Sequence, residues 1–297
     1  MDKESRKASR KASRKATAFF DLKAKSAVDY VIAIPSYKRA DTLRDKSLRV
    51  LKEYGIDARK IFVFVANEGE RKVYAETLVP GTYGEIVTAV KGIGPVRNFI
   101  FDYFPIGQPV VSMDDDIKGF LEFDENAKRH TKRLTNLKRV IQRGFSECRR
   151  HGCRLWGMYP VANGYFMQDT ISFDLRFIIA CFEGFFNPGT EGPKGVRINR
   201  KGHKDDHESS ILFYKTDGAV VRLNYVAAQT AYHTEKGGLQ EYTGKGQIRS
   251  PEGILEGAEW LVRKYPNYAT LNLGKATGRA DVRLRDKRPE DKRQTGS

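Results

Sequence analysis

The stretch QPVVSMDDD, residues 108–116, joins a short apolar run to three consecutive aspartates. An uninterrupted apolar run of this length is typical of a strand that is buried on both faces of a parallel sheet. Asp114 and Asp116 are separated by one residue, so in extended backbone their side chains point to the same side. The aspartates could form an acidic loop, a divalent metal site, or a pair of acid–base carboxylates.

On the N-terminal side of this stretch, apolar runs alternate with helical patterns. We expect strands at 30–35, 60–67 and 84–92, and helices at 40–55 and 94–104. Alternation of this kind predicts an α/β fold, with a Rossmann-like, mostly parallel sheet flanked by helices. After the aspartates, we expect helices at 131–150, 205–218 and 250–266 and strands at 156–163 and, as a bent pair, within 171–186.

The distribution of charge divides the chain into three parts. Of the net charge of +16, residues 1–25, with three SRKA repeats, hold nine Lys/Arg against three acids. We interpret residues 1–25 as a disordered basic arm, 26–272 as a single core domain, and 273–297 as a basic tail. Within the core, residues 128–154 carry ten Lys/Arg against one acid. This basic segment indicates a polyanionic partner such as DNA, or else a charged face that keeps the protein in solution.

The sequence also predicts the cellular compartment in which the protein is found. No apolar stretch approaches the roughly 20 residues that span a bilayer, and no apolar segment of a signal peptide follows the basic N-terminus. Cys148, Cys153 and Cys181 lack the spacing of a metal site, which indicates reduced thiols. We expect a monomer in the cytoplasm, without a membrane partner.

Three polar stretches follow predicted strands, at the edge where open α/β sheets bind ligands. They are PSYKRAD (35–41), KGIGPVRN (91–98) and the aspartates. Gly92 and Gly94 allow close approach of a ligand just before a helix start, which is a favourable seat for pyrophosphate. Carboxylate oxygens select Mg²⁺ or Mn²⁺. Together these stretches predict a divalent cation that bridges the protein to a diphosphate.

The motifs IPSYKR, KGIGPVRN and SMDDD, in this order, resemble those of GT-A glycosyltransferases. In that family an Asp-x-Asp motif holds a metal ion on the diphosphate of a nucleotide sugar. With HKDDHESS (203–210), WGMYPVAN (156–163) and AYHTEKGG (231–238), the chain is more closely similar to the DNA-base glycosyltransferases of phages and their relatives. These include the TET-associated enzymes that act on 5-hydroxymethylcytosine and the kinetoplastid base J glucosyltransferase. The likeness covers residues 30–240, and a phage-encoded enzyme would work in the host-cell cytoplasm.

The resemblance implies roles at the donor side of a GT-A-like site. The metal ion would be bound by Asp114, Asp116 and His233, with His203 and His207 as competitors for the histidine position. The UDP-sugar would be contacted by the remaining donor-side residues, which are Pro35, Tyr37, Arg39, Gly94, Arg97, Asn98, Asp115 and, again, Asp114.

The resemblance also implies an acceptor side, where a carboxylate removes the proton of the attacking hydroxyl and the anomeric centre inverts. Asp206 is our preferred base, with Asp205 as its alternative because the usual Glu-Asp pair is replaced by Asp-Asp. Candidates to stack on the modified base are Tyr159, Tyr165, Phe166, Phe185 and Phe186. Competing hypotheses are a protein or glycan acceptor, an inactive nucleic-acid-binding protein, and a nucleotidyltransferase.

Overall fold

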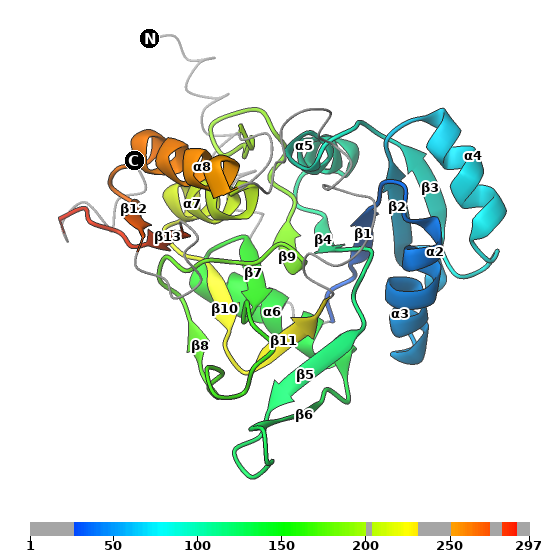
Figure 1. The fold of residues 1–297 in the computed structure, drawn as a ribbon, viewed down its shortest axis with the longest axis horizontal. Coiled ribbons are helices and arrows are strands. Elements are labelled where there is room, and N and C mark those ends of the chain that lie inside the picture. Colours follow the sequence, from blue (N-terminus) through cyan, green and yellow to red (C-terminus); the bar gives the residue numbers. More distant parts are fainter. Residues whose placement is uncertain (1–26, 200–203, 231–250, 274–280, 290–297) are drawn as a thin grey trace, which may run out of the picture.

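An eight-stranded sheet forms the centre of the protein (Figure 1). The structure is a computed structural model that describes residues 27–199, 204–230, 251–273 and 281–289. The strand order is β3-β2-β1-β4-β9-β7-β10-β8. In chain order these strands are β1 (Val31–Pro35), β2 (Ile61–Val65), β3 (Glu85–Thr88), β4 (Pro109–Met113), β7 (Leu155–Met158), β8 (Ile171–Ser172), β9 (Phe182–Phe186) and β10 (Val221–Leu223).

The strand direction reverses at β9 within this sheet and again at the edge strand β8, which is antiparallel to β10. Strands β3, β2, β1 and β4 are parallel, β9 is antiparallel to both of its neighbours, and β7 and β10 are parallel again. Strands that lie parallel to the preceding strand of the chain are reached through a crossover connection. Strand β9 is instead reached from β8 through the irregular segment 173–181. The predicted α/β fold is therefore confirmed, with a mixed sheet whose N-terminal half is the parallel part.

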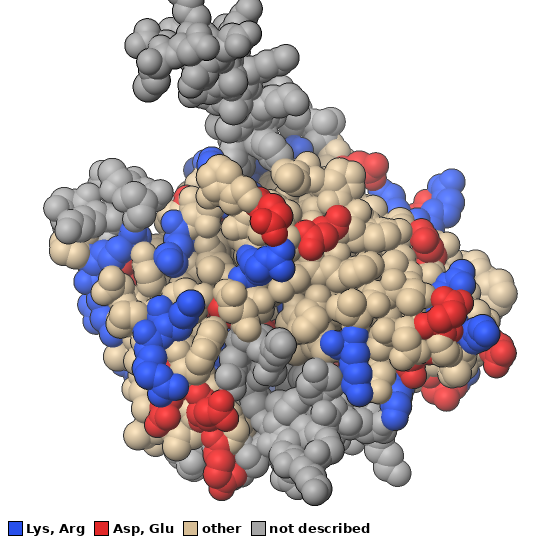
Figure 2. Space-filling view, turned by 90° about the horizontal axis from the view of Figure 1, so that it is seen from above, with Lys and Arg blue, Asp and Glu red and all other residues tan. Residues whose placement is uncertain are grey.

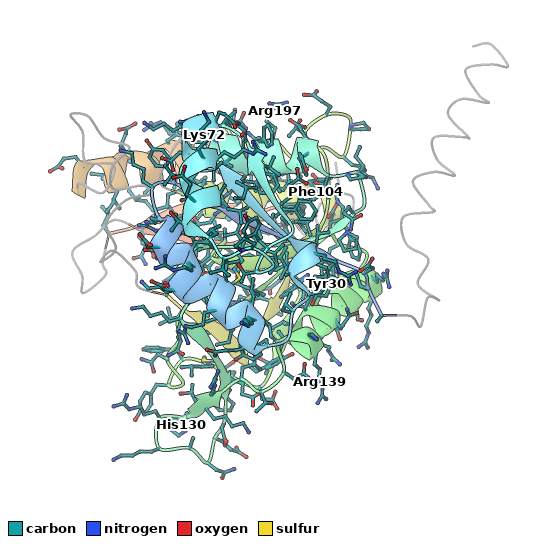
Figure 3. The ribbon with its side chains drawn as sticks, turned by 90° about the vertical axis from the view of Figure 1, so that its right-hand side faces the viewer. Tyr30, Lys72, Phe104, His130, Arg139 and Arg197 are labelled. Atoms are coloured by element: carbon teal, nitrogen blue, oxygen red, sulfur yellow. The ribbon has the colours of Figure 1, made fainter. Side chains whose placement is uncertain are left out.

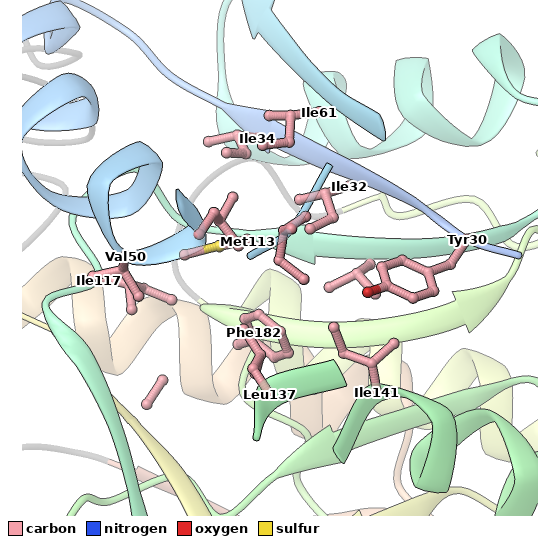
Figure 4. Packing of buried hydrophobic residues seen from close by; sticks show 14 of the residues in the cluster. Tyr30, Ile32, Ile34, Val50, Ile61, Met113, Ile117, Leu137, Ile141 and Phe182 are labelled. Carbon is pink, nitrogen blue, oxygen red and sulfur yellow. The ribbon is translucent and has the colours of Figure 1, made fainter. Parts of the chain in front are cut away.

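Helices cover both faces of the sheet. On one face lie α2 (Ala40–Leu43), the π-helical turn η2 (Arg44–Leu48), α3 (Arg49–Glu53), α4 (Glu68–Thr77) and α6 (Leu137–His151). Figure 4 shows part of this core, with Ile32, Met113 and Phe182 of the sheet on one side and Leu137 and Ile141 of α6 on the other. The other face is covered by α5 (Ile93–Tyr103), α7 (Asp205–Asp217) and α8 (Pro251–Lys264). Coverage on both faces explains why the strands are continuous apolar runs.

Two smaller sheets flank the central one. Strands β5 (Gly119–Phe123), β6 (Thr131–Arg133) and β11 (Val226–Gln229) form an antiparallel sheet in the order β11-β5-β6. Strand β12 (Ala269–Asn272) pairs with β13 (Asp281–Leu284), and Val282 is buried in the core. Part of the segment 273–297, which the sequence assigned to a basic tail, is thus packed on the core.

Several element boundaries differ from those expected. Residues 131–133 form β6, and α6 begins only after Asn136, whose side chain accepts a hydrogen bond from Arg139 N at 2.9 Å. Helix α4 was not predicted, because Tyr74 is its one buried residue and no apolar stripe marks it. The strands β8 and β9 within 171–186 are separated in the sheet by β7 and β10, so they are not a pair. The short 3₁₀ turn η3 (Ala58–Lys60) precedes β2.

The cysteines and the hydropathy of the helices are the next features of the fold. Cys148, Cys153 and Cys181 are all buried and form no disulfide. Among the described residues, no helix combines the length and apolarity needed to cross a bilayer.

Candidate active site

The carboxyl ends of β1 and β4 lie side by side at the point where the strand order reverses. From β1 the chain proceeds to β2 and β3 on one side, and then returns through α5 to place β4 on the other side. A topological switch point of this kind is where open α/β sheets bind ligands. The predicted stretches 35–41 and 114–116 meet there, because each directly follows one of these two strands.

The backbone of the aspartate triplet is held from two directions. Asp114 N donates to Cys181 O at 2.9 Å, just before β9. The hydroxyl of Ser47 in η2 donates to Asp114 O at 2.7 Å and accepts from Ile117 N at 3.0 Å. The turn that carries the three carboxylates is therefore fixed between the sheet and the first helical segment.

Asp115 is the inward-facing member of the triplet and is 5 % exposed. Its Oδ2 accepts from Ser36 Oγ at 2.6 Å, and its Oδ1 accepts from Arg39 Nη1 at 3.2 Å. The same Arg39 nitrogen lies 3.7 Å from Asp116 Oδ2. Burial raises the pKa of Asp115 to about 6, although Arg39 and Ser36 oppose the rise. Asp115 thus ties the triplet to the loop after β1.

Arg97, the fifth residue of α5, is the centre of a second cluster. It is 7 % exposed, and its Nη1 donates to Glu183 Oε1 of β9 at 3.1 Å. Its Nε lies 2.9 Å from Asp205 Oδ2 at the start of α7. The sequence predicted that Arg97 would contact the donor, whereas in the structure its guanidinium faces these two carboxylates.

Glu183 is the buried charged residue that sequence reasoning missed. It lies within the run FEGFF (182–186), and every residue of this strand is buried. A lone carboxylate inside a buried strand was the available signal, because such a charge needs a partner. Its Oε2 and the Oδ2 of Asp205 are buried atoms without a hydrogen bond among the described residues.

Burial and mutual repulsion raise the pKa values of this group of carboxylates. Burial raises the pKa of Asp114 to about 8, with Asp116 adding to the rise and Arg97 opposing it. Burial likewise raises the pKa of Glu183 to about 7 and that of Asp205 to about 6, in both cases against Arg97. One arginine does not balance so many acids, so a bound cation would stabilise their ionised forms.

Asp206 and His207 form a pair beside this cluster. Asp206 Oδ1 accepts from His207 N at 2.8 Å and contacts His207 Nδ1 at 2.8 Å. Burial opposes ionisation of Asp206, but His207, Arg97 and Lys204 outweigh it and lower the pKa of the carboxyl. The Asp206 side chain is 26 % exposed, compared with 12 % for Asp205. Asp206 is therefore the more accessible of the two predicted bases, and it is ionised.

The other residues that were predicted to contact the UDP-sugar lie in different parts of the structure. Pro35 ends β1 opposite Phe64, and Gly94 is buried in α5. Asn98 uses its amide on the backbone of Ile198, donating at 2.8 Å and accepting at 2.9 Å. Tyr37 lies at the switch point.

Two ammonium groups flank the Tyr37 ring. The Nζ atoms of Lys38 and Lys91 lie 5.6 Å and 5.2 Å from its centroid. These cations make the rim between β1 and β3 suitable for an anion.

The histidine position of the predicted metal site lies outside the described residues, since His203 and His233 both fall there. His207, the third candidate, uses Nδ1 on Asp206, and its Nε2 lies 3.8 Å from Asp281 Oδ1. In the described part of the chain, no group of three or more His, Cys, Asp or Glu is arranged to hold a metal ion.

The carboxylate oxygens of Asp114 and Asp116 nevertheless suit Mg²⁺ or Mn²⁺, the cations that the sequence predicted. Asp116 raises the pKa of Asp114, so their charges interact. Mg²⁺ commonly binds through one or two carboxylates together with substrate phosphates, and does not need a closed cage of protein ligands. The residues present thus suit a cation that arrives with a diphosphate.

The basic segment 128–154 does not form one helical ridge. Lys132 and Arg133 belong to β6, and Arg154 is buried in a salt bridge with Asp217 at 2.8 Å. The exposed cations of this segment are Lys128, Arg129, Lys132, Arg133, Lys138, Arg139, Arg143 and Arg150. This run of exposed cations differs from the face shown in Figure 2, where Lys and Arg are interspersed with Asp and Glu.

The candidate stacking residues divide into three groups. Phe185 and Phe186 are 2 % and 6 % exposed and pack into the cores on opposite faces of β9, so they cannot stack on a base. The Tyr159 ring lies under Arg222, 5.2 Å from the guanidinium carbon. Tyr165 and Phe166 are 69 % and 62 % exposed.

The chain was compared with family models, curated proteins and solved structures. No family model matches the chain, and no curated protein matches its sequence. Among solved structures, it is similar to TarS from S. aureus, with 12 % identity, a TM-score of 0.42 and coverage of 67 % of this chain and 60 % of that one. It is also similar to the mannosyltransferase PcManGT from Pyrobaculum calidifontis in complex with GDP-Man and Mn²⁺, with 14 % identity, a TM-score of 0.45 and coverage of 85 % and 69 %. The chain thus spans about three fifths of the TarS structure. Both TM-scores are below 0.5, so neither likeness carries a conclusion about the site.

Proposed function

We propose that this chain is a metal-dependent GT-A-type glycosyltransferase that moves a sugar from a UDP-sugar to 5-hydroxymethylcytosine in DNA, with inversion. The observation that carries the proposal is the position of Asp114 and Asp116 at the switch point between β1 and β4. A crowded pair of carboxylates at a ligand-binding edge is suited to a divalent cation on a diphosphate.

The donor would lie along the carboxyl ends of β1, β3 and β4. Asp114 and Asp116 would hold Mg²⁺ or Mn²⁺, which acts as a Lewis acid on the leaving diphosphate. Lys38 and Lys91 flank the Tyr37 ring at the same edge and would attract the phosphates. Arg39 orients the triplet by donating to Asp115 and by pairing with Asp116.

The acceptor hydroxyl would be deprotonated by Asp206. Asp205 is turned toward Arg97, whereas Asp206 is more exposed and its pKa is lowered, so it is ionised at neutral pH. The hydrogen bonds from His207 hold the Asp206 carboxylate in a fixed orientation. A base in this position contributes roughly 10²–10⁴-fold to the rate.

A nucleic-acid acceptor is supported by the exposed cations on α6 and around the β5–β6 hairpin. A neutral carbohydrate acceptor gives no reason for them, whereas a DNA backbone does. Each neutralised phosphate of duplex DNA changes log K by about −0.9 per decade of salt. The proposed enzyme would therefore bind its acceptor in a strongly salt-dependent manner.

The test is incubation of the full chain with a panel of UDP-hexoses, Mn²⁺ and 5-hydroxymethylcytosine DNA, followed by mass spectrometry of the nucleosides. We expect a hexose adduct with at least one donor, and none with the Asp116→Asn variant. Glu76→Gln is the matched control, because Glu76 is an exposed acid on α4, outside the site. Failure of every donor, or an adduct that survives Asp116→Asn, would overturn the proposal.

A further inference from the structure

Two large aromatic side chains are exposed next to a basic hairpin, and the site described above does not use them. Tyr165 and Phe166 follow β7 in the loop 159–168 and are 69 % and 62 % exposed. The Tyr165 ring meets His130 edge-on, with centroids 5.1 Å apart, at the tip of the β5–β6 hairpin. Lys128 and Arg129 at this tip are exposed, and no carboxylate of the described residues forms an ion pair with either.

The hairpin tip and the aromatic loop are built against each other. A Cβ on Gly164 would lie 2.3 Å from Arg129 O, so only glycine allows this close approach of the two backbones. Each loop also has its own hydrogen bonds, such as Phe166 N to Asn163 O at 3.1 Å and Asp124 N to His130 O at 3.0 Å. The loop that carries the exposed rings is therefore held in a fixed position against the hairpin.

A polar groove of about 690 Å³ lies beside α6. Arg139 and Arg143 of α6, Asp169, Thr170 and Tyr225 are among the residues that line it. Residues 168–170 lead along the chain from the aromatic loop to the lining of this groove. Asn224 holds this segment in place, because Gln168 N donates to Asn224 O at 3.1 Å and Asn224 N donates to Thr170 O at 3.0 Å.

The two arginines of the groove have different surroundings. Arg143 pairs with Glu147 at 2.8 Å, whereas no described carboxylate forms an ion pair with Arg139. Glu122 and Asp169 are the acids that line the groove together with them. Arg139 is therefore the cation best placed to take a phosphate.

We propose that Tyr165, Phe166 and the α6 groove bind a single strand of nucleic acid, with unpaired bases on the two rings and the phosphates along Lys128, Arg129 and Arg139. Exposed aromatic faces beside unpaired cations match the way single strands are bound, since every base can stack on a ring. A duplex offers phosphates but no free base faces. The inference deepens the proposed function, on which it rests for the identity of the acceptor.

The test is fluorescence anisotropy of the full chain with a short labelled single strand containing 5-hydroxymethylcytosine, and with the matching duplex. Replacing both rings, Tyr165→Ala with Phe166→Ala, should weaken single-strand binding by about tenfold or more, the effect of losing a base–aromatic stack. Arg139→Ala should lower the slope of log K against log salt by about 0.7, as for one phosphate of a single strand.

Matched controls lie elsewhere on the molecule. Ile106→Ala removes an apolar side chain that is 62 % exposed, as Phe166 is, and should leave strand binding unchanged. Lys72→Ala removes an exposed cation at the end of the molecule opposite His130 (Figure 3) and should leave the salt slope unchanged.

The inference is overturned if the double aromatic variant binds the single strand as tightly as the unaltered chain. It is also overturned if that variant loses affinity equally for the duplex. Sugar transfer, measured in parallel, separates the two proposals. If the chain transfers no sugar but the double variant loses affinity for the single strand, the binding surface is supported and the proposed function is wrong.

Discussion

The guanidinium of Arg97 lies 2.9 Å from the carboxylate of Asp205, and this ion pair joins the helix after β3 to the helix that carries the predicted base. The other arm of Arg97 donates to Glu183 of β9 at 3.1 Å. Three elements that are far apart in sequence therefore meet at one buried cation, whose charge also acts on Asp114 of the triplet.

Replacing Arg97 with Met should strongly destabilise the fold, because Glu183 and Asp205 would remain buried without their cation. Removing one partner of a buried ion pair typically costs about 3–5 kcal/mol, measured here as the free energy of unfolding in urea. Arg71→Met is the control: Arg71 forms an exposed pair with Glu68 at 3.0 Å, and such pairs contribute about 0–1 kcal/mol. Equal losses for the two variants would contradict the structural role given to Arg97.

The two adjacent aspartates of α7 should respond differently to substitution. Asp206→Asn should lower kcat by roughly 10²–10⁴-fold and leave both donor binding and stability largely intact. Asp205→Asn should lower the free energy of unfolding, because it weakens the ion pair with Arg97. Steady-state kinetics and urea unfolding of both variants check this division. Full activity of Asp206→Asn would remove it as the base.

Stability should depend on pH through Asp114. The pKa of this group is about 8 in the folded protein, against an ordinary value of 3.8. Between these two values the folded state binds more protons than the unfolded state, so this group's contribution to the free energy of unfolding falls as pH rises and levels off above about 8. In EDTA, the unaltered chain should therefore lose more stability between pH 5 and 8 than Asp114→Asn does.

Mn²⁺ should flatten this pH dependence, because a cation on the carboxylates competes with the proton. Urea unfolding across the pH range, with EDTA or with Mn²⁺, provides the measurement. The same pH slope in the unaltered chain and in Asp114→Asn would show that Asp114 does not hold its proton in the fold.

Trp156 is wedged between glycines, and this packing leaves no room for a methyl group. A Cβ on Gly184 would lie 2.3 Å from Trp156 Nε1, so Gly184→Ala should lower the free energy of unfolding by about 1–3 kcal/mol. At Gly119 the nearest atom is Gln229 Oε1 at 3.3 Å, the end of a flexible side chain that can move away. Gly119→Ala should therefore be close to neutral in urea unfolding. A neutral Gly184→Ala would contradict this packing.

Much of the parallel half of the fold was readable from the sequence, because β1 and β4 are short apolar runs that end in distinctive polar residues. The rule that ligands bind beyond the carboxyl ends of such strands predicted that the loop after β1 and the aspartates would share one edge. Their meeting through Arg39 and Asp115 is consistent with it.

What the sequence did not reveal depends on long-range pairing. Glu183 finds Arg97 only because β9 reverses direction beside β4, and nothing local indicates that reversal. Arg154 looks like part of a basic surface until its partner Asp217, 63 residues away, is brought next to it. Phe185 and Phe186 looked available for stacking, but both faces of their strand are covered.

The most direct test of the central claim is calorimetric titration of UDP-sugars into the full chain in Mn²⁺ and in EDTA, repeated with the double variant Asp114→Asn, Asp116→Asn. If the triplet holds a cation on the donor diphosphate, at least one UDP-sugar binds in Mn²⁺, and its binding is lost both in EDTA and in the variant. Binding that persists in EDTA, or that the variant retains in full, would contradict the claim, as would the absence of binding by every UDP-sugar in Mn²⁺.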